Sequence, residues 1–422
     1  MNTAIEVPVG LTWAGGAYMK LQWLLAILFL IGAGTFLSLL LSGTESVPWP
    51  FLLANFMFLI GVSQFGVCFS AILHLCRAKW ARPFYRLGEI MTLAFLPFAF
   101  GVFLLIFFFG RHELFYWLDA LPEDRASPWL SSNGLLFRNL GAQLVFYGLA
   151  IYYFIVGLLP DVSEQNSQSG PNWRRNLYRR LFAIKVRHDQ RQLKARVYLL
   201  APAVLIIYVV VNTIIALDFG MMLVEHYHST VYAMFFIQGN NLAGTAAILL
   251  LSTLLIRSTT VREYFGVNQL KSMGIMLTGF VLLWLYLFWA QFFVTWFGNL
   301  PNEFGPLWKQ MYGHYGPYFW AMISCVFFIP LLAFLKAETK KAWWSLLLVS
   351  AIICSGVWIN RYLMVVPIFL DDHQPFSSLT DIALTIGLTS GFLVVLLWLL
   401  NAFPVVSAWE LNDAKIEDDP SY

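Results

Sequence analysis

Ten apolar stretches run through this sequence, and they limit the folds that it can adopt more than any other feature. An α-helix of about 20 residues spans the ~30 Å apolar core of a bilayer. Each stretch is about that long, and none shows the alternation of apolar and polar residues that a membrane β-barrel needs. We therefore predict an all-α integral membrane protein with ten transmembrane helices. The stretches cover residues 21–41, 51–75, 90–109, 140–159, 197–217, 231–256, 273–295, 318–335, 343–366 and 382–400.

The composition excludes several classes of function. Of the 422 residues, 59% are hydrophobic and 12% are charged, whereas soluble domains carry about 25% charged residues. Basic and acidic residues nearly balance, at 26 and 23, which gives no reason to expect nucleic-acid binding. The four cysteines lie inside apolar stretches without the spacing of a metal site or a haem attachment. We expect no metal, no covalently bound cofactor and no catalytic residue in this chain.

The distribution of lysine and arginine predicts the orientation in the membrane. Most of these residues lie in the loops after the second, fourth, sixth and eighth stretches, and such loops stay on the cytoplasmic side. Both termini are then expected in the cytoplasm. The longest basic loop, residues 161–196, places Trp173, Leu177 and Leu181 at helical spacing. This spacing indicates an amphipathic helix on the membrane surface that contacts anionic phospholipids.

A faint internal repeat predicts how the helices group. The tripeptide alanine, isoleucine, leucine occurs at 71–73 and at 247–249, and the same offset aligns Gln64 with Asn240. Helices two to five and six to nine would then form two four-helix bundles of the same orientation, although chance alignment of apolar stretches explains the repeat equally well. The expected domains are 1–42 with the first helix, 51–217 with the first bundle, 231–370 with the second bundle, and 382–422 with the last helix and an acidic tail.

Ionisable residues are rare inside the predicted helices, where they are costly and usually functional. His74 lies near the inner end of the second helix and Glu89 just before the third, so no chain of carboxylates is expected to carry ions across the membrane. Neutral polar side chains are more frequent. They serve either as contacts between helices or as contacts to water or a ligand. The candidates that we select for a proton path are Tyr286, Gln291, Asn240 and Asn241.

Two arginines lie toward the outer ends of predicted helices. Arg138 precedes the fourth apolar stretch, and Arg361 is followed by the apolar residues 362–367. We interpret both as buried charges on the outer side. A guanidinium below the membrane surface needs a carboxylate or several carbonyl oxygens as partners. The alternative is that these side chains reach up to the membrane surface.

Three parts of the sequence together resemble the NrfD/PsrC family, the quinone-interacting membrane subunits of polysulfide reductase and related complexes. The first begins at 55–61, from Asn55 to Gly61, and continues through 70–73 to the basic turn at 77–80. The second joins 285–291 to 296–303, and the third is 360–367, which contains Arg361. The resemblance is to the ten-helix branch of the family. It implies two four-helix bundles with flanking helices in the bacterial cytoplasmic membrane.

The resemblance also implies partners and a function. Members of this branch assemble with a homologous NrfD-like subunit, an extracytoplasmic Fe–S subunit and multihaem cytochrome c subunits, and they exchange electrons with menaquinone. Quinone-site members carry histidines where this sequence has Gln64 and Phe108, and residues 110–117 and 137–139 look more like ActF of alternative complex III. Our first hypothesis is an ActF-like subunit of a respiratory quinol-oxidising complex. It would be structural, with a proton path as an added role and no redox cofactor of its own.

Two alternatives stay open. One is a quinone-binding subunit of a Qrc-, Dsr- or polysulfide-reductase-type complex, with Gln64, Arg111 and His112 against the quinone head group. The other belongs to a different class and is a stand-alone transporter. The lack of charged residues in the interior, and of helices broken by glycine–proline pairs, disfavours the transporter.

Overall fold

The computed structural model describes residues 17–118, 128–164, 171–255 and 264–418. These residues form helices and turns without a β-strand, and ten helical spans are long and apolar enough to cross a membrane. The predicted all-α membrane fold is thus confirmed. The spans are α1 (Ala17–Ser42), α2 (Trp49–Leu75), α3 (Arg82–Leu105), α5 (Ser132–Leu158), α8 (Gln190–Phe219), α9 (Tyr232–Leu255), α10 (Val267–Gly298), α12 (Gly316–Ile323) continued by α13 (Ile329–Phe334), α14 (Trp343–Phe369) and α15 (Leu379–Ala402).

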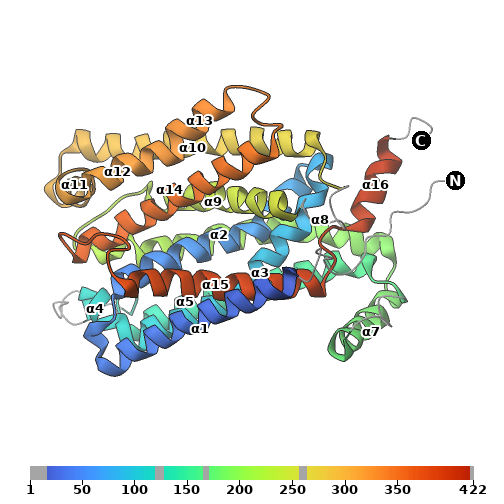
Figure 1. The fold of residues 1–422 in the computed structure, drawn as a ribbon, viewed down its shortest axis with the longest axis horizontal. Helices are drawn as coiled ribbons and strands as arrows, with labels where there is room; N and C mark the ends of the chain where they lie inside the picture. The colour runs from blue at the N-terminus through green and yellow to red at the C-terminus, as the bar shows by residue number, and fades with distance from the viewer. Residues whose placement is uncertain (1–16, 119–127, 165–170, 256–263, 419–422) are drawn as a thin grey trace.

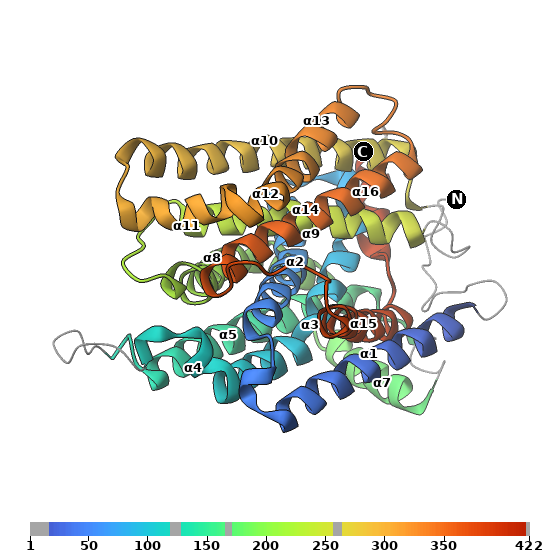
Figure 2. The same cartoon turned by 60° about the vertical axis from the view of Figure 1, so that its left-hand side comes forward.

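Helix α2 is the centre of the assembly. It packs in a ring with α3, α5 and α8, while α9, α10, α14 and the α12–α13 span form a second ring. The two rings meet where α2 packs on α9 and α14 and where α8 packs on α9. Helices α1 and α15 pair beside α3, on the side of the molecule away from the second ring (Figures 1 and 2). A side chain at the junction of the rings is therefore surrounded by protein on all sides.

The two ends of the spans carry different short helices (Figure 1). Helices α7 (Asn172–Val186) and α16 (Ala408–Asp418) lie beyond the end at which α1 begins and α15 ends, and we call this end the terminal face. Helices α4 (Arg111–Leu114) and α11 (Pro301–Met311) lie at the other end, the opposite face. The terminal face is the one predicted to be cytoplasmic, and that orientation stays a prediction.

Helix α7 confirms the helix predicted in the longest basic loop. Its Tyr178 and Leu181 side chains are buried, and Trp173 stacks on Trp398 of α15. The Lys185 ammonium donates to two backbone carbonyls just after α5, and burial lowers its pKa. The apolar side of α7 therefore packs on the ends of transmembrane helices. Its contact with anionic phospholipids stays a prediction.

The third span begins earlier than predicted. We expected it at 90–109 with Glu89 just outside, and this was wrong, because α3 begins at Arg82 and Glu89 lies inside it, 4% exposed. Arg82 and Arg86 on the same helix are also buried. Hydropathy fails here because these charged side chains pair with groups on other helices. The protein, and not water, then solvates the charges.

Small residues set the spacing of neighbouring spans. Helices in lipid gain little from apolar burial against one another, so close backbone packing and hydrogen bonds hold them together. A Cβ added to Gly88 in α3 would lie 2.6 Å from the Gly66 carbonyl oxygen in α2. Beside this contact, Thr92 Oγ1 accepts from the Val67 amide at 2.8 Å and donates to the Ser63 carbonyl at 2.6 Å. The α2–α3 pair therefore requires glycine at both positions.

Substituting Gly88→Ala is expected to lower the free energy of unfolding by about 2 kcal/mol, because the new methyl group meets backbone atoms that cannot move aside. Unfolding of the purified chain in detergent, followed by tryptophan fluorescence, measures this change. Gly101→Ala in the same helix is the matched control, since its added Cβ would have nothing within 4 Å. Equal losses in the two variants would contradict this account of α2–α3 packing.

Candidate functional site

Five buried polar side chains form a continuous chain of hydrogen bonds across the junction of the two rings. We call Gln143, Gln64, Asn212, Asn240 and Arg361 the central chain. Arg361 Nη2 donates to Asn240 Oδ1 at 3.0 Å, and Asn240 donates to Asn212 at 2.9 Å. Asn212 donates to Gln64 at 2.9 Å, and Gln64 donates to Gln143 at 2.8 Å. All four bonds point the same way, so each polarises the next, and they tie α14, α9, α8, α2 and α5 together.

Arg361 is fully buried, and its partners are neutral. Besides Asn240, its guanidinium donates to the Phe236 carbonyl at 2.7 Å and to Asn360 Oδ1 at 3.2 Å, and it lies 4.0 Å from the centroid of the Phe236 ring. A Cβ on Gly239 would lie 2.5 Å from Arg361 Nη2, so glycine leaves the space for the charge. From the sequence we expected a carboxylate or several carbonyl oxygens around this guanidinium. The described residues provide backbone and amide oxygens and the Phe236 ring. A positive charge without a carboxylate opposes the passage of other cations.

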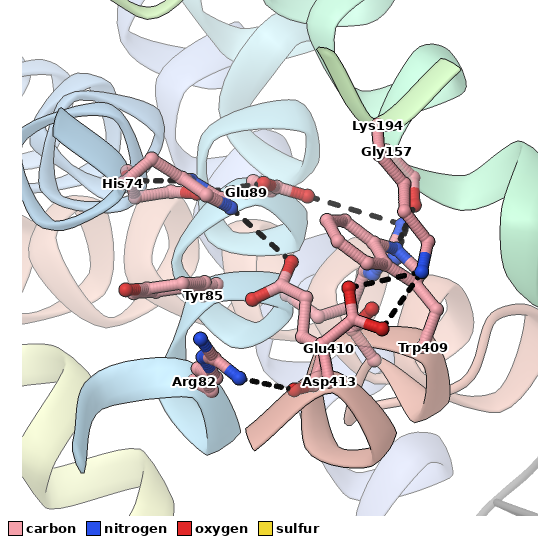
Figure 3. A network of polar contacts seen from close by, with 12 residues as sticks. His74, Arg82, Tyr85, Glu89, Gly157, Lys194, Trp409, Glu410 and Asp413 are labelled. Carbon is pink, nitrogen blue, oxygen red and sulfur yellow. Dashed lines mark hydrogen bonds and ion pairs between the residues drawn. The ribbon is translucent and has the colours of Figure 1, made fainter. Parts of the chain in front are cut away.

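A cluster of titratable side chains lies near the terminal face (Figure 3). This terminal-face cluster consists of Ser70, His74, Glu89, Tyr153 and Glu410. Ser70 Oγ donates to Glu89 Oε1 at 2.7 Å and lies 3.3 Å from His74 Nδ1. On the other side of the imidazole, His74 Nε2 lies 3.2 Å from Glu410 Oε1. The cluster thus links a carboxylate inside α3 to a carboxylate on α16 through one histidine.

His74 keeps its partners in more than one protonation state. Its Nδ1 lies 2.9 Å from the Ser70 carbonyl and 2.8 Å from the Tyr153 hydroxyl. When Nδ1 carries a hydrogen, it faces the Ser70 carbonyl at 2.9 Å and Ser70 Oγ at 3.3 Å as acceptors, and when it does not, it accepts from the Tyr153 hydroxyl. A histidine with both options can receive a proton at one nitrogen and release one at the other.

Two arginines of α3 support this cluster. Arg86 donates to Asp161 Oδ2 at 2.9 Å and to the Gly157 carbonyl at 2.8 Å, and it lies 3.9 Å from Glu89 Oε2. Arg82 donates to the backbone carbonyl of Glu410 at 2.8 Å. These contacts balance the buried carboxylates with nearby positive charge, which a low-dielectric interior requires.

A second titratable cluster lies near the opposite face. This opposite-face cluster consists of Tyr315, Tyr362, His373 and Asp381. The Tyr362 hydroxyl donates to the His373 carbonyl at 2.8 Å and lies 3.0 Å from His373 Nδ1, while His373 Nε2 lies 3.2 Å from Asp381 Oδ2. The His373 amide donates to the Tyr315 hydroxyl at 3.3 Å. Across the described ranges, no three His, Cys, Asp or Glu side chains are placed to hold a metal ion.

The three candidates for a quinone site do not come together. Gln64 lies in the central chain, where its amide oxygen and nitrogen are both hydrogen-bonded. Arg111 and His112 are neighbours on α4 at the opposite face, with Arg111 Nε donating to His112 Nε2 at 3.1 Å. Gly110, just before them, packs on the Trp49 ring at the start of α2. At ~1.5 Å per residue, Gln64 lies about 22 Å farther along that helix, too far for a single head group.

Two proton-path candidates lie at the junction of the rings. Asn240 belongs to the central chain, and Asn241 is its neighbour on α9. Asn241 accepts from the Tyr208 hydroxyl at 2.9 Å and donates to Gln238 Oε1 at 3.2 Å. The two neighbouring asparagines therefore have different hydrogen-bond partners, with Asn240 in the central chain and Asn241 between Tyr208 and Gln238.

The other two proton-path candidates, Gln291 and Tyr286, lie on a different helix, α10. Gln291 accepts from Ser229 Oγ at 2.5 Å and donates to the Tyr227 hydroxyl at 2.9 Å, beside a cavity of about 430 Å³ that Glu303 also lines. Burial raises the pKa of the Tyr227 hydroxyl, and the Glu303 carboxylate raises it further, so this hydroxyl stays neutral. Tyr286 is 65% exposed on the side of α10 that would face lipid or another subunit.

Arg138 forms the tightest ion pair near the opposite face. Its Nε and Nη2 donate to the two carboxylate oxygens of Asp218, both at 2.8 Å, and Asn139 donates to the same carboxylate at 2.5 Å. The guanidinium also lies 4.5 Å from the centroid of the Trp129 ring. This pair fixes α5 to α8, whereas the fully buried Arg361 is held by neutral groups.

His74 and Glu89 stand out in the sequence, but the assembly of the two titratable clusters could not be predicted from it. Arg82, Arg86 and Glu89 are spaced to lie on one side of a helix, and that spacing was the signal that α3 begins before its apolar run. Nothing local marks Glu410, because its partner His74 is 336 residues away in the sequence. His373 lies in the loop between α14 and α15, and no local sequence pattern pairs it with Asp381.

Comparison with known proteins assigns the chain to a family. The sequence profile of the family described as "Polysulphide reductase, NrfD" matches residues 39–370, which include every span from α2 to α14. A search of curated proteins finds no match. The matched range contains the whole central chain and ends before His373, Asp381 and Glu410.

Substituting Asn240→Leu is expected to lower the free energy of unfolding by about 3 kcal/mol, because it removes a partner from the buried Arg361 charge as well as the bond to Asn212. Gln143→Leu at the end of the central chain removes one neutral bond and should cost only ~0.6 kcal/mol. Chemical unfolding of both variants in detergent measures the difference. Equal losses would show that Arg361 does not depend on the central chain.

Proposed function

The chain belongs to the NrfD polysulphide reductase family, and from this premise we propose that it is an ActF-like subunit that carries protons and holds no redox cofactor. Its membership makes it a membrane subunit of a polysulfide-reductase-type oxidoreductase complex. The proposal concerns what the chain contributes to that complex. The observation that carries it is the position of Arg361, a buried positive charge between two titratable clusters.

The geometry around Gln64 supports a subunit without its own quinone site. A quinone head group needs hydrogen-bonding side chains that converge on one space. Both polar ends of the Gln64 amide are already engaged by Asn212 and Gln143, and Arg111 and His112 lie at the opposite face. The three residues therefore do not fit a quinone, and menaquinone would bind to another subunit of the complex.

The two clusters contain the groups that proton transfer requires. His74, Glu89 and Glu410 near the terminal face, and His373 and Asp381 near the opposite face, can each take up and release a proton. The central chain between them has no such group, since its members are amides and one arginine. We propose that protons reach the middle from either face and that Arg361 prevents passage until the complex changes conformation.

The central chain lies a short distance along the helices from each of the two titratable clusters. Ser70 of the terminal-face cluster lies about 9 Å along α2 from Gln64 at ~1.5 Å per residue. On the other side, Arg361 and Tyr362 are consecutive residues of α14. Water molecules could complete hydrogen-bonded paths over such distances.

The proposed complex contains electron-transfer subunits as partners of this chain. NrfD-family subunits usually assemble with Fe–S and other electron-transfer subunits. For this chain we propose a homologous NrfD-like subunit in the bacterial cytoplasmic membrane, with an Fe–S subunit and multihaem cytochrome c subunits on the extracytoplasmic side. Aromatic side chains exposed on α10 offer a surface for a neighbouring membrane subunit, namely Tyr286, Trp289, Phe293, Trp296 and Phe297.

Purification from native membranes in mild detergent tests the assembly. We expect the tagged chain to co-purify with proteins that carry haem c and Fe–S clusters, seen by optical and electron paramagnetic resonance spectra. A stable oligomer of this chain alone would contradict the proposal and favour a transporter.

Substituting Arg361→Gln is expected to raise the passive proton leak of proteoliposomes that contain the complex. Each ~1.4 kcal/mol of electrostatic barrier that is removed should speed the leak about tenfold. Arg361→Lys is the matched control, because it keeps the charge while changing the contacts. A pH-sensitive dye inside the vesicles reports the leak. The role of Arg361 as a barrier fails if the glutamine and lysine variants leak equally, or if neither differs from the natural chain.

A further inference from the structure

The residues after α15 pack against the titratable cluster, and Figure 3 shows Glu410 beside His74. We call residues 405–413 the C-terminal cap. Its first residues are buried, with Val406 and Ser407 at 0% and Glu410 at 5% exposure. A segment loses conformational entropy when it packs this tightly, so specific contacts must hold it in place.

Two acidic residues anchor the cap to the first ring. Asp161 accepts from Ser407 Oγ at 3.0 Å and from the Trp409 amide at 2.9 Å. Asp413 forms an ion pair with Lys194 of α8 at 2.8 Å, and the Lys194 ammonium lies 5.1 Å from the centroid of the Trp409 ring. The Lys194–Asp413 pair is partly exposed, whereas the Asp161 contacts are buried. The cap therefore has a firm inner anchor and a weaker outer one.

Glu410 is the part of the cap that enters the cluster. Its carboxylate lies 3.2 Å from His74 Nε2, and Arg82 fixes its backbone carbonyl. The Tyr85 ring lies on one side of the imidazole, with centroids 4.2 Å apart, and the Tyr198 ring meets it edge-on at 5.5 Å. Within the described residues, Glu410 is the acid that faces Nε2, while Glu89 is reached from the Nδ1 side through Ser70.

We propose that Glu410 is the group through which the terminal-face cluster exchanges protons with the aqueous phase, and that the C-terminal cap controls the rate of this exchange. The inference rests on the proposed proton-carrying function and names its access route. A structural tie between α16 and α2 would need no acid at this position. The acid matters because it completes a line of proton donors and acceptors from the C-terminal cap to Glu89.

The proposed proton transfer from Glu410 to Glu89 conserves the number of protons and the charge. Protonated Glu410 gives its proton to His74 Nε2 while the Nδ1 hydrogen passes to Ser70 Oγ, and the Ser70 hydroxyl hydrogen passes to Glu89 Oε1. Glu410 ends as a carboxylate and Glu89 as a carboxylic acid, and the total charge of the cluster is unchanged. The ring is then in its other neutral form, and the Tyr153 hydroxyl is in place to donate to the free Nδ1.

A pH jump on the full-length chain in nanodiscs tests the route without the rest of the complex. Infrared spectroscopy follows the carboxylic acid band of Glu89, which Glu89→Gln identifies by its loss. Glu410→Gln keeps the size and polarity of the side chain, and we expect it to slow protonation of Glu89 about a hundredfold, the usual contribution of a positioned acid or base. Glu338→Gln, an exposed acid between α13 and α14, should leave the rate unchanged. Equal rates in Glu410→Gln and the natural chain would overturn the proposal.

Loosening the cap gives a second test that does not alter the cluster. Asp413→Asn removes the partly exposed pair with Lys194, which costs at most about 1 kcal/mol of stability, so this variant is expected to fold. We expect faster protonation of Glu89 because the cap opens more often. A rate that does not change, or that falls, would overturn the role of the cap.

The tests of the access route and of the proposed function can fail independently. If Glu410→Gln protonates Glu89 normally while Arg361→Gln still changes the proton leak, the access route is wrong and the proton-carrying function stands. If Glu410→Gln slows protonation while the Arg361 variants leave the leak unchanged, the access route is right and the barrier at Arg361 is wrong.

Discussion

In lipid, a buried polar group must find its partners inside the protein, and Arg361 is where this constraint acts most strongly. Its guanidinium is held by carbonyl and amide oxygens and an aromatic ring, and no carboxylate neutralises it within the described residues. Asn240 connects the charge to side chains on three further helices. Gly239 leaves the room that it occupies. The junction between the two rings of helices is therefore built around one positive charge.

That charge gives the two titratable clusters separate roles. The terminal-face cluster reaches as deep as Glu89 and is closed outward by Glu410, whereas His373 and Asp381 belong to the opposite face. Amides and a fixed cation separate them, and under the proposed function this cation keeps protons from passing freely from one face to the other. In the proposed complex, such separation would let a partner subunit couple its reaction to proton movement by shifting the groups around Arg361.

Hydropathy and charge predicted the ten spans and α7, because lipid imposes long apolar helices and the basic loop has helical spacing. The same logic misplaced Glu89, since a carboxylate that pairs with Arg86 and Ser70 can lie inside a span that hydropathy excludes. Arg361 stood out in the sequence as a buried charge and Asn240 as a neutral polar residue of the interior, but the chain that joins them to Asn212 and Gln64 depends on how the rings meet. Glu410 was beyond prediction because its partner His74 is 336 residues away in the sequence.

The central claim is that the buried clusters carry protons while electrons pass through other subunits. The most direct test is the number of protons moved per electron by the reconstituted complex, compared between the natural chain and Glu89→Gln. The account predicts that electron transfer continues in the variant while the protons moved per electron fall. An unchanged ratio at an unchanged rate of electron transfer would contradict it.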